Sequence, residues 1–280
     1  MIRSFDEPPG KSPRASGPKS LLRSIERALA AKSNDPSDRA QELFYDALDA
    51  STDEEELKLL QKALKLDTGN VDVLLALFRH QGFCEADEIE YLQKLVALAE
   101  MRLGPEAFKE FAGAFWGFHE TRPYMRARQA LAEHLRAAGR VEEAVTEYSA
   151  MLELNPGDNQ GVRYSLLPCL LILQRLAAVK KLFASYPQEY EFNAVFAWGR
   201  VLQRFLSDDV PGAAKALVVA RKQNRHLQAY LKGNRRMPKT WPEAYSPGSK
   251  EEAICFADVI RAAWKKYPAA LEWLDAQKVP

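Results

Sequence analysis

A helix–turn–helix pattern in residues 125–156 constrains the fold more than any other feature of this chain. The segment reads MRARQALAEHLRAAGRVEEAVTEYSAMLELNP. Gly139 divides it into two halves, and glycine commonly ends a helix and permits a tight turn. Each half has apolar positions at helical spacing: Leu131, Ala132, Leu135, Ala144, Tyr148 and Met151. The pattern therefore predicts two helices joined by a short turn, and Pro156 closes the unit.

Counted back from Pro156, this unit resembles a tetratricopeptide repeat (TPR), which is a helical hairpin of about 34 residues. The match includes the large, small and large residues of its first helix, the glycine at its turn and the inner positions of its second helix. The resemblance implies an all-α fold in which TPR-like hairpins stack into an α-α superhelical solenoid. Such a solenoid offers a curved surface that binds another molecule, and the resemblance carries over no catalytic residue.

The remaining sequence predicts four regions. Residues 1–18 are rich in proline and glycine and are expected to be a disordered tail. Residues 19–36 form an N-terminal helix that ends at Asn34-Asp35-Pro36, and residues 37–224 hold about five TPR-like units. The repeat period is lost beyond this point, so residues 225–280 are expected to be a helical C-terminal cap. Ser249 and Glu252 have the spacing of a capping box that begins a helix in this cap.

Composition argues against several classes of function. The 280 residues carry a net charge of +1, so no global field points to nucleic acid or to a membrane. There is no apolar run of about 18 residues and no hydrophobic N-terminal signal segment, so no membrane association is predicted. Cys84, Cys169 and Cys255 are scattered, which is typical of reduced structural thiols. We expect a cytoplasmic protein without a metal or a cofactor.

The first candidate site is the segment HETRPYMRAR, residues 119–128. Arg122 and Arg126 are one helical turn apart, and clustered guanidinium groups suit the capture of carboxylate or phosphate. Tyr124 between them could serve as an aromatic anchor for a peptide. In the structural alternative, the arginines cover the aromatic insert PEAFKEFAGAFWGFHE that precedes them. The lone histidine of the segment does not make a metal site.

The second candidate site is the polar segment that follows Pro156. Asn159, Gln160 and Arg163 fall near the start of a repeat's first helix, which lines the concave groove of TPR solenoids, and Tyr164 offers a second aromatic anchor. Amide side chains at such positions can bind a peptide backbone. The alternative is that these groups hydrogen-bond across the turn between repeats. Together with the first site, they form the predicted peptide-binding surface.

A third feature is the basic stretch 210–242, which has no aspartate or glutamate. The cations that could contact nucleic acid are Arg221, Lys222, Arg225, Lys232, Arg235, Arg236 and Lys239. Because Tyr230 and Trp241 are interleaved with them, one hypothesis is a surface that follows phosphates and stacks bases. The other hypothesis is a surface that docks on acidic groups of the same chain or of a partner. Acids gather at residues 46–56, so head-to-tail self-association is also consistent with the charge pattern.

Beyond the superfamily, the chain resembles a group of uncharacterised bacterial TPR proteins through the motifs ETRPYMRAR and LNPGDNQGVRY. The resemblance implies a scaffold or adaptor. No GxSxG, P-loop or GxGxxG motif is present, so no catalytic residue is predicted. We expect a non-catalytic protein that binds a protein or peptide. The alternatives are a nucleic-acid adaptor that uses residues 210–242, and an enzymatic or small-molecule-binding subunit with its site at the HETRPY segment.

Overall fold

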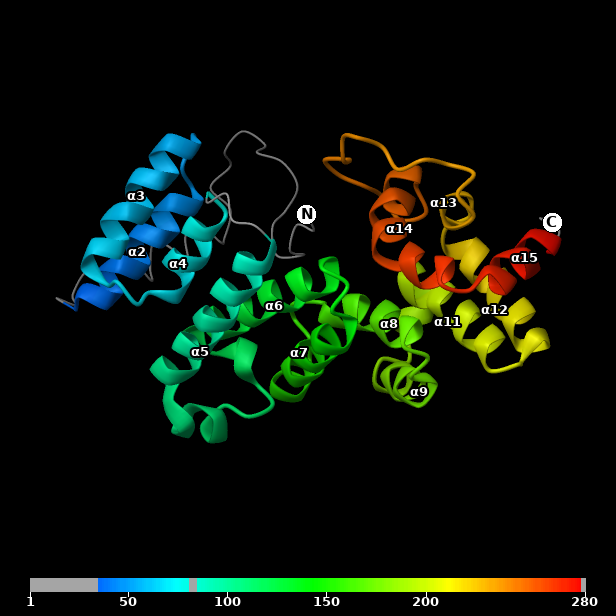
Figure 1. The fold of residues 1–280 in the computed structure, drawn as a ribbon, viewed down its shortest axis with the longest axis horizontal. Coiled ribbons are helices and arrows are strands. Elements are labelled where there is room, and N and C mark those ends of the chain that lie inside the picture. Colours follow the sequence, from blue (N-terminus) through cyan, green and yellow to red (C-terminus); the bar gives the residue numbers. More distant parts are fainter. Residues whose placement is uncertain (1–34, 81–84, 278–280) are drawn as a thin grey trace. The chain divides into compact units, whose positions relative to one another are not determined.

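The computed structural model describes residues 35–80 and 85–277 (Figure 1). Within these ranges the regular elements are helices and no strand occurs, which confirms the all-helical prediction. The predicted tail and nearly all of the predicted helix at 19–36 lie outside the described residues. None of the described helices combines the length and the apolar character that crossing a bilayer requires.

The described residues divide into two compact units. The N-terminal unit comprises residues 35–80, 85–134 and 153–157, and the C-terminal unit comprises residues 135–152 and 158–277. The boundary between the units therefore falls within one helix, Arg122–Ala137.

The N-terminal unit contains short helices and one long interrupted helix. Its elements are α2 (Pro36–Leu48), α3 (Asp53–Leu66), α4 (Val71–Phe78), α5 (Glu85–Glu110), the 3-10 turns η1 (Phe115–Gly117) and η2 (His119–Thr121), and most of α6 (Arg122–Ala137). Helices α2, α3 and α4 contact one another. Their shared core is apolar and includes Ala40, Phe44, Leu60, Ala63 and Val73. Burial of these side chains supplies the driving force for packing.

Side-chain caps fix where these helices begin. Thr52 accepts a hydrogen bond from the Glu55 backbone N–H at 3.2 Å, and Asn70 accepts one from Val73 at 3.0 Å. Helix α3 opens on four acidic residues, which suit the positive end of the helix dipole. Helix α5 is interrupted at Gly104, whose φ of 72° is left-handed, and Pro105 begins the next helical turn, as the sequence predicts. Local sequence thus sets these boundaries.

The best TPR match covers α6 and α7 (Val141–Leu154). The structure buries all six of its predicted inward positions. Gly139 between the helices has a φ of 75°, and the next backbone N–H, that of Arg140, bonds to the Leu135 carbonyl at 2.8 Å. A residue with a Cβ would be strained at this φ. The glycine therefore ends α6 and redirects the chain into α7.

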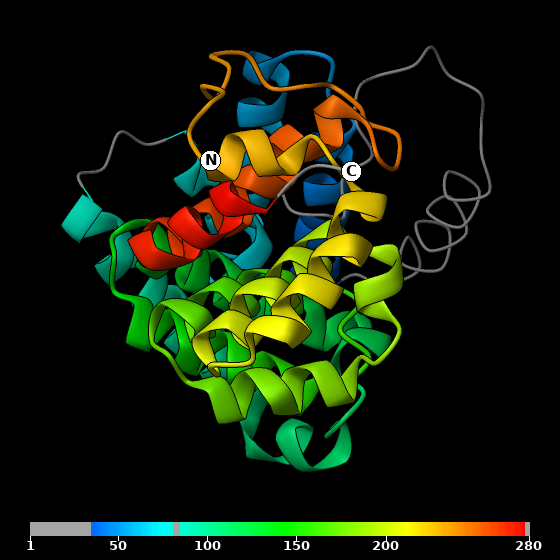
Figure 2. The same ribbon diagram turned by 90° about the vertical axis from the view of Figure 1, so that its right-hand side faces the viewer.

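The C-terminal unit contains α7 and a series of further helices. These are α8 (Val162–Ile172), α9 (Leu176–Ser185), α10 (Glu189–Phe192), α11 (Ala194–Leu206), α12 (Val210–Gln223), α13 (Leu227–Leu231), α14 (Lys250–Lys265) and α15 (Pro268–Ala276). Helix α11 is the centre of this unit, because it contacts α8, α9, α12, α14 and α15. Figures 1 and 2 show α11 and α12 running side by side.

Large aromatic side chains and one glycine form the middle of the C-terminal unit. The indole rings of Trp198 on α11 and Trp264 on α14 are fully buried and lie 6.1 Å apart in an edge-to-face arrangement. Gly199 allows close packing, since a Cβ there would lie 2.7 Å from a Leu167 methyl of α8. The hydroxyl of Tyr267 donates to the Leu171 carbonyl at 2.7 Å. Helix α14 and the residues after it thus cover α8 and α11.

The predicted helix start at Ser249 is confirmed, although the reciprocal bond of the capping box comes from Gly248 in place of Ser249. The Ser249 hydroxyl oxygen accepts a hydrogen bond from the Glu252 backbone N–H at 3.0 Å. The buried Glu252 carboxylate accepts from the Gly248 backbone N–H at 2.8 Å and from the Asn224 amide at 2.7 Å. These bonds join the end of α12 to the start of α14 and hold the C-terminal end of the non-helical stretch 233–248. The predicted helical cap therefore contains a stretch that is not helical.

Candidate binding surfaces

The structure packs the first predicted site against the aromatic insert of the N-terminal unit. Arg122 donates from Nε to the Trp116 carbonyl at 3.0 Å, and its guanidinium lies 5.7 Å from the centre of the Trp116 ring. Tyr124 is only 2% exposed and packs edge-on against Phe108, with ring centres 5.2 Å apart. In this conformation the Tyr124 ring belongs to the core and does not face a partner.

Arg126 forms a two-pronged ion pair with Asp72. Its Nε lies 2.8 Å from Oδ1 and its Nη2 lies 2.5 Å from Oδ2. Asp72 stands in the first turn of α4, its side chain is fully buried, and the Gln41 amide also donates to it at 3.0 Å. Parallel N–H···O bonds of this type are the strongest geometry available to an arginine. The guanidinium predicted to bind a partner is thus engaged by an acid of the same unit.

The second predicted site forms a polar network in the C-terminal unit. Arg163 donates to Asp158 at 2.8 Å, to Glu189 at 2.9 Å and to the Tyr164 hydroxyl at 2.7 Å. Tyr164 donates in turn to Glu189 at 2.7 Å. Among the predicted neighbours, Gln160 is buried and Asn159 is exposed. The network joins the start of α8 to α10.

Asp158 is the residue that organises this network. Its carboxylate accepts from the backbone N–H groups of Val162 and Arg163 at 2.9 and 3.0 Å, so it caps α8 from a left-handed position with a φ of 48°. Burial raises the pKa of Asp158, and the bonds from Arg163 and Val162 offset this effect only in part. Burial likewise raises the pKa of the nearby Tyr186 to about 12. Asp158 therefore caps α8 and holds Arg163 at the same time.

These contacts show where the residues of both predicted sites lie, and they do not test whether either site binds a partner. Arg122, Arg126 and Arg163 make internal contacts, while Tyr124 and Gln160 are buried. Asn159 is the exposed member of the set. The prediction of peptide binding at these residues stays a prediction, and the alternative of internal hydrogen bonding has direct geometric support.

Four of the predicted basic residues line one open pocket of about 470 Å³ between α12 and α13. They are Arg221, Lys222, Arg225 and Lys232, and no aspartate or glutamate lines the pocket with them. Val218, which is 68% exposed, forms its apolar edge. The structure does not place Arg235, Arg236 or Lys239 in this lining. We call the four cations and Val218 the α12–α13 basic surface.

The cations of this surface differ in how they are held. Arg221 donates to Gln228 and to the Gln277 carbonyl, both at 3.0 Å, and Lys232 pairs with Asp275. Lys222 and Arg225 are exposed, and neither has an ion-pair partner in the part of the chain that the structure describes. Partial burial, followed by the charges of Arg225, Lys250 and Arg235, lowers the pKa of His226. The surface therefore carries positive charge that no carboxylate among the described residues pairs with at Lys222 and Arg225.

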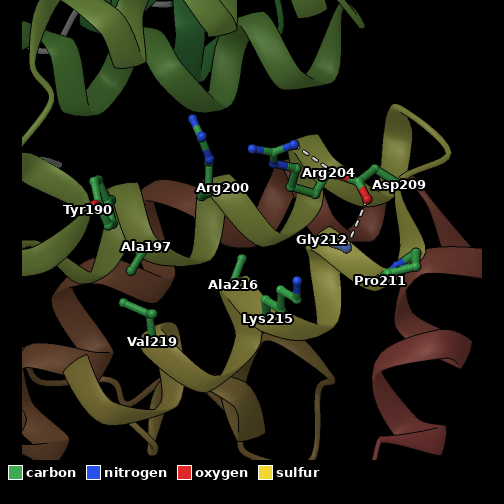
Figure 3. Close-up of a pocket in the computed structure, with 10 residues that line it drawn as sticks. All are labelled: Tyr190, Ala197, Arg200, Arg204, Asp209, Pro211, Gly212, Lys215, Ala216 and Val219. Carbon is green, nitrogen blue, oxygen red and sulfur yellow. Dashed lines mark hydrogen bonds and ion pairs between the residues drawn. The ribbon is translucent and has the colours of Figure 1, made fainter.

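A second pocket, between α11 and α12, contains residues that sequence reasoning missed. Arg200 and Arg204 line it together with Lys215 (Figure 3). These two arginines lie one helical turn apart on α11, whose other residues are mostly apolar and buried. This spacing in the sequence AVFAWGRVLQRFL is the signal that could have pointed to them. Sequence pattern alone does not show that a cation of α12 faces this pair, because the facing residues are set by how the two helices pack.

The described residues contain no group of three or more His, Cys, Asp or Glu side chains that could hold a metal ion. Burial raises the pKa of the Cys169 thiol to about 11, so it is protonated at neutral pH. Neither observation points to catalysis at these groups.

No protein-family model matches this chain, and a search of curated proteins finds no significant relative. The observations above define an all-helical protein with positively charged surface pockets in its C-terminal unit.

Proposed function

We propose that this protein is a non-catalytic adaptor built from TPR-like repeats, and that its C-terminal unit binds an acidic polypeptide segment on the α12–α13 basic surface. The observation that carries the proposal is the pocket lined by four cations and no carboxylate. Lys222 and Arg225 are exposed there without an ion-pair partner among the described residues. Opposite charge on a partner would steer encounter and fix orientation.

A polypeptide fits this surface better than a nucleic acid does. Proteins that bind single strands without sequence preference stack bases on aromatic side chains. The pocket lining contains no aromatic residue, and its apolar element is the exposed aliphatic side chain of Val218. A segment that combines acidic residues with an aliphatic side chain would match both features. A nucleic acid would also match the positive charge, but no aromatic side chain lines this pocket to stack on its bases.

The repeat arrangement of the proposal rests on local features. Gly139 is left-handed between α6 and α7, and the inward positions of the best TPR match are buried. A solenoid of this type would present successive helices as an extended binding surface. The internal contacts of Arg126 and Arg163 are the reason for preferring the basic surface over the originally predicted groove as the site of contact.

The test compares two charge reversals of equal size in the full-length protein. The double variant K222E/R225E inverts the basic surface, while the control K180E/K181E inverts two exposed lysines of α9. The probe is a fluorescein-labelled peptide of alternating glutamate and leucine, followed by fluorescence anisotropy. We expect K222E/R225E to weaken binding at least about tenfold and the control to change it by less than about twofold, since charge pairs at a protein surface act over about a Debye length.

A labelled oligothymidylate of equal charge serves as the comparison probe. Tighter binding of the oligonucleotide, with a steep loss of affinity as salt rises, would support the nucleic-acid adaptor instead. Equal losses in both charge-reversal variants would show that only overall charge matters and would exclude a specific surface.

A further inference from the structure

The pocket between α11 and α12 has an unusual charge balance. It encloses about 500 Å³, which lies within the range of about 300–1,000 Å³ typical of small-molecule sites. Arg200, Arg204 and Lys215 line it, and Asp209 is the single carboxylate among the lining residues. Figure 3 shows Arg200 and Arg204 rising side by side from α11, with Lys215 on α12. The lining therefore has an excess of two positive charges.

Asp209 offsets one of the three positive charges, and both of its oxygens are hydrogen-bonded. One accepts from Arg204 Nη1 at 2.7 Å, and the other accepts from the Gly212 backbone N–H at 2.8 Å and so caps α12. These two bonds lower the pKa of Asp209, with the Gly212 bond as the larger cause. Asp209 thus orients Arg204, while Arg200 and Lys215 supply the excess positive charge of the lining.

Arg200 is held in place by packing. Its guanidinium lies over the Phe183 ring of α9, 5.0 Å from the ring centre, and its helix is buried on both sides of it at Gly199 and Val201. Partial burial, and then the neighbouring charge of Arg204, lowers the pKa of Arg200. Within the described ranges no carboxylate pairs with Arg200. A partly desolvated guanidinium without a counter-ion is unfavourable, and a bound anion would relieve that cost.

The rest of the pocket wall is apolar. Ala197, Ala216 and Val219 line it between the two helices, and the half-exposed ring of Tyr190 lies at one end. The cations therefore stand beside an aliphatic and aromatic surface. A ligand that fills such a site needs an apolar body as well as negative charge. Inorganic phosphate alone would satisfy only one of these features.

We propose that this pocket binds a phosphate monoester with an apolar or aromatic body, with the phosphate between Arg200 and Lys215. A phosphate monoester carries a charge of about −1.5 to −2 at neutral pH, which matches the excess charge of the lining. The same chemistry occurs in a free aryl or alkyl phosphate and in a phosphotyrosine side chain. The site is separate from the α12–α13 basic surface, because the two pockets share no lining residue.

Phenyl phosphate is the probe that tests this site, with phenol and inorganic phosphate as the comparison ligands. Binding to the full-length protein is measured by calorimetry, and backbone amide signals are followed by NMR. We expect phenyl phosphate to bind at least about tenfold more tightly than either comparison ligand and to shift the amides of Gly212 and Ala216. Affinity for phenyl phosphate no better than for phenol would overturn the proposal.

Three substitutions locate the site. R200Q and K215Q each remove one charge from the pocket, and R225Q removes one from the other basic surface as a matched control. We expect about a tenfold loss of affinity for phenyl phosphate in R200Q and K215Q and less than about a twofold change in R225Q. Equal losses in all three would show non-specific attraction and reject the site. Lys215 is exposed, so K215Q decides the outcome even if R200Q fails to fold.

A phosphotyrosine peptide distinguishes the source of the phosphate. An affinity at least about tenfold higher than that of phenyl phosphate, lost in K215Q, would identify a phosphorylated polypeptide as the ligand. Equal affinities would identify a free small molecule, because the added peptide would then contribute no contact.

Discussion

Arg126 of α6 and Asp72 of α4 are 54 positions apart, yet they form a two-pronged ion pair at 2.8 and 2.5 Å. The Asp72 side chain is fully buried, whereas 30% of the Arg126 side chain is exposed. A buried carboxylate needs a partner of opposite charge and further hydrogen-bond donors, and here Gln41 supplies one of these. The pair joins the beginning of α4 to α6 inside the N-terminal unit.

Replacing Arg126 should therefore destabilise the N-terminal unit. We expect R126A to lower the free energy of unfolding by about 3 kcal/mol, because it leaves Asp72 buried without its ionic partner. R126K should recover part of the loss, since lysine keeps the charge but not the paired N–H donors. Chemical denaturation measures both variants. A loss below about 1 kcal/mol in R126A would show that the pair contributes little to stability.

The raised pKa of Asp158 predicts how stability changes with pH. The folded protein binds a proton on the Asp158 carboxyl group more tightly than the unfolded chain does. The contribution of Asp158 to stability therefore grows as the pH falls through its raised pKa, down to the unfolded value of about 3.9. D158N removes this contribution. We therefore expect the unfolding free energy of the wild type to increase relative to that of D158N as the pH falls from 7 to 4.5.

Asp208 provides the control for Asp158, because it also has a positive φ but is exposed. D208N removes an exposed carboxylate and is compared with D158N under the same conditions. If D158N and D208N give the same pH profile, Asp158 does not titrate as its burial implies.

Gly199 should not tolerate a side chain. A Cβ at this position would lie 2.7 Å from a methyl carbon of Leu167 and 3.3 Å from its Cγ, so G199A would force the Leu167 side chain of α8 away from α11. We expect a loss of about 1–3 kcal/mol in unfolding free energy, which is typical of overpacking. G117A is the control, since a Cβ there meets no atom within 4 Å. Equal thermal midpoints for the two variants would contradict the tight packing of α8 against α11.

We expect the binding of an acidic partner to be coupled to proton uptake at His226. Partial burial and the cations Arg225, Lys250 and Arg235 lower its pKa, and Glu251 opposes them. An acidic partner would raise that pKa again, so binding would take up a proton and strengthen as pH falls below about 6.5. Each unit by which the pKa rises corresponds to at most about a tenfold gain in affinity.

Anisotropy titrations of the glutamate–leucine peptide at pH 7.5 and 5.5 measure this coupling. We expect H226Q to lose most of the gain at the lower pH while keeping its affinity at pH 7.5. An unchanged gain in H226Q would assign the proton uptake to another group.

Much of the local structure follows from short-range sequence signals. The all-helical content, the interruption at Gly104 and the capping box of Ser249 and Glu252 could all be predicted, because each depends on residues within one or two helical turns. The buried positions of α6 and α7 follow from the 3.6-residue period in the same way. The basic stretch was also visible, although only part of it lines one pocket.

Tertiary structure decided which side chains are exposed and which make internal contacts. Sequence alone could not show that Arg126 meets Asp72, that Tyr124 enters the core, or that Arg200 and Lys215 line one pocket. Each of these relations joins residues on different helices, and the way helices pack depends on how their side chains interlock over long sequence separations. The sequence by itself therefore determined the helices and their ends, while packing determined which charges are neutralised internally and which remain available for a ligand.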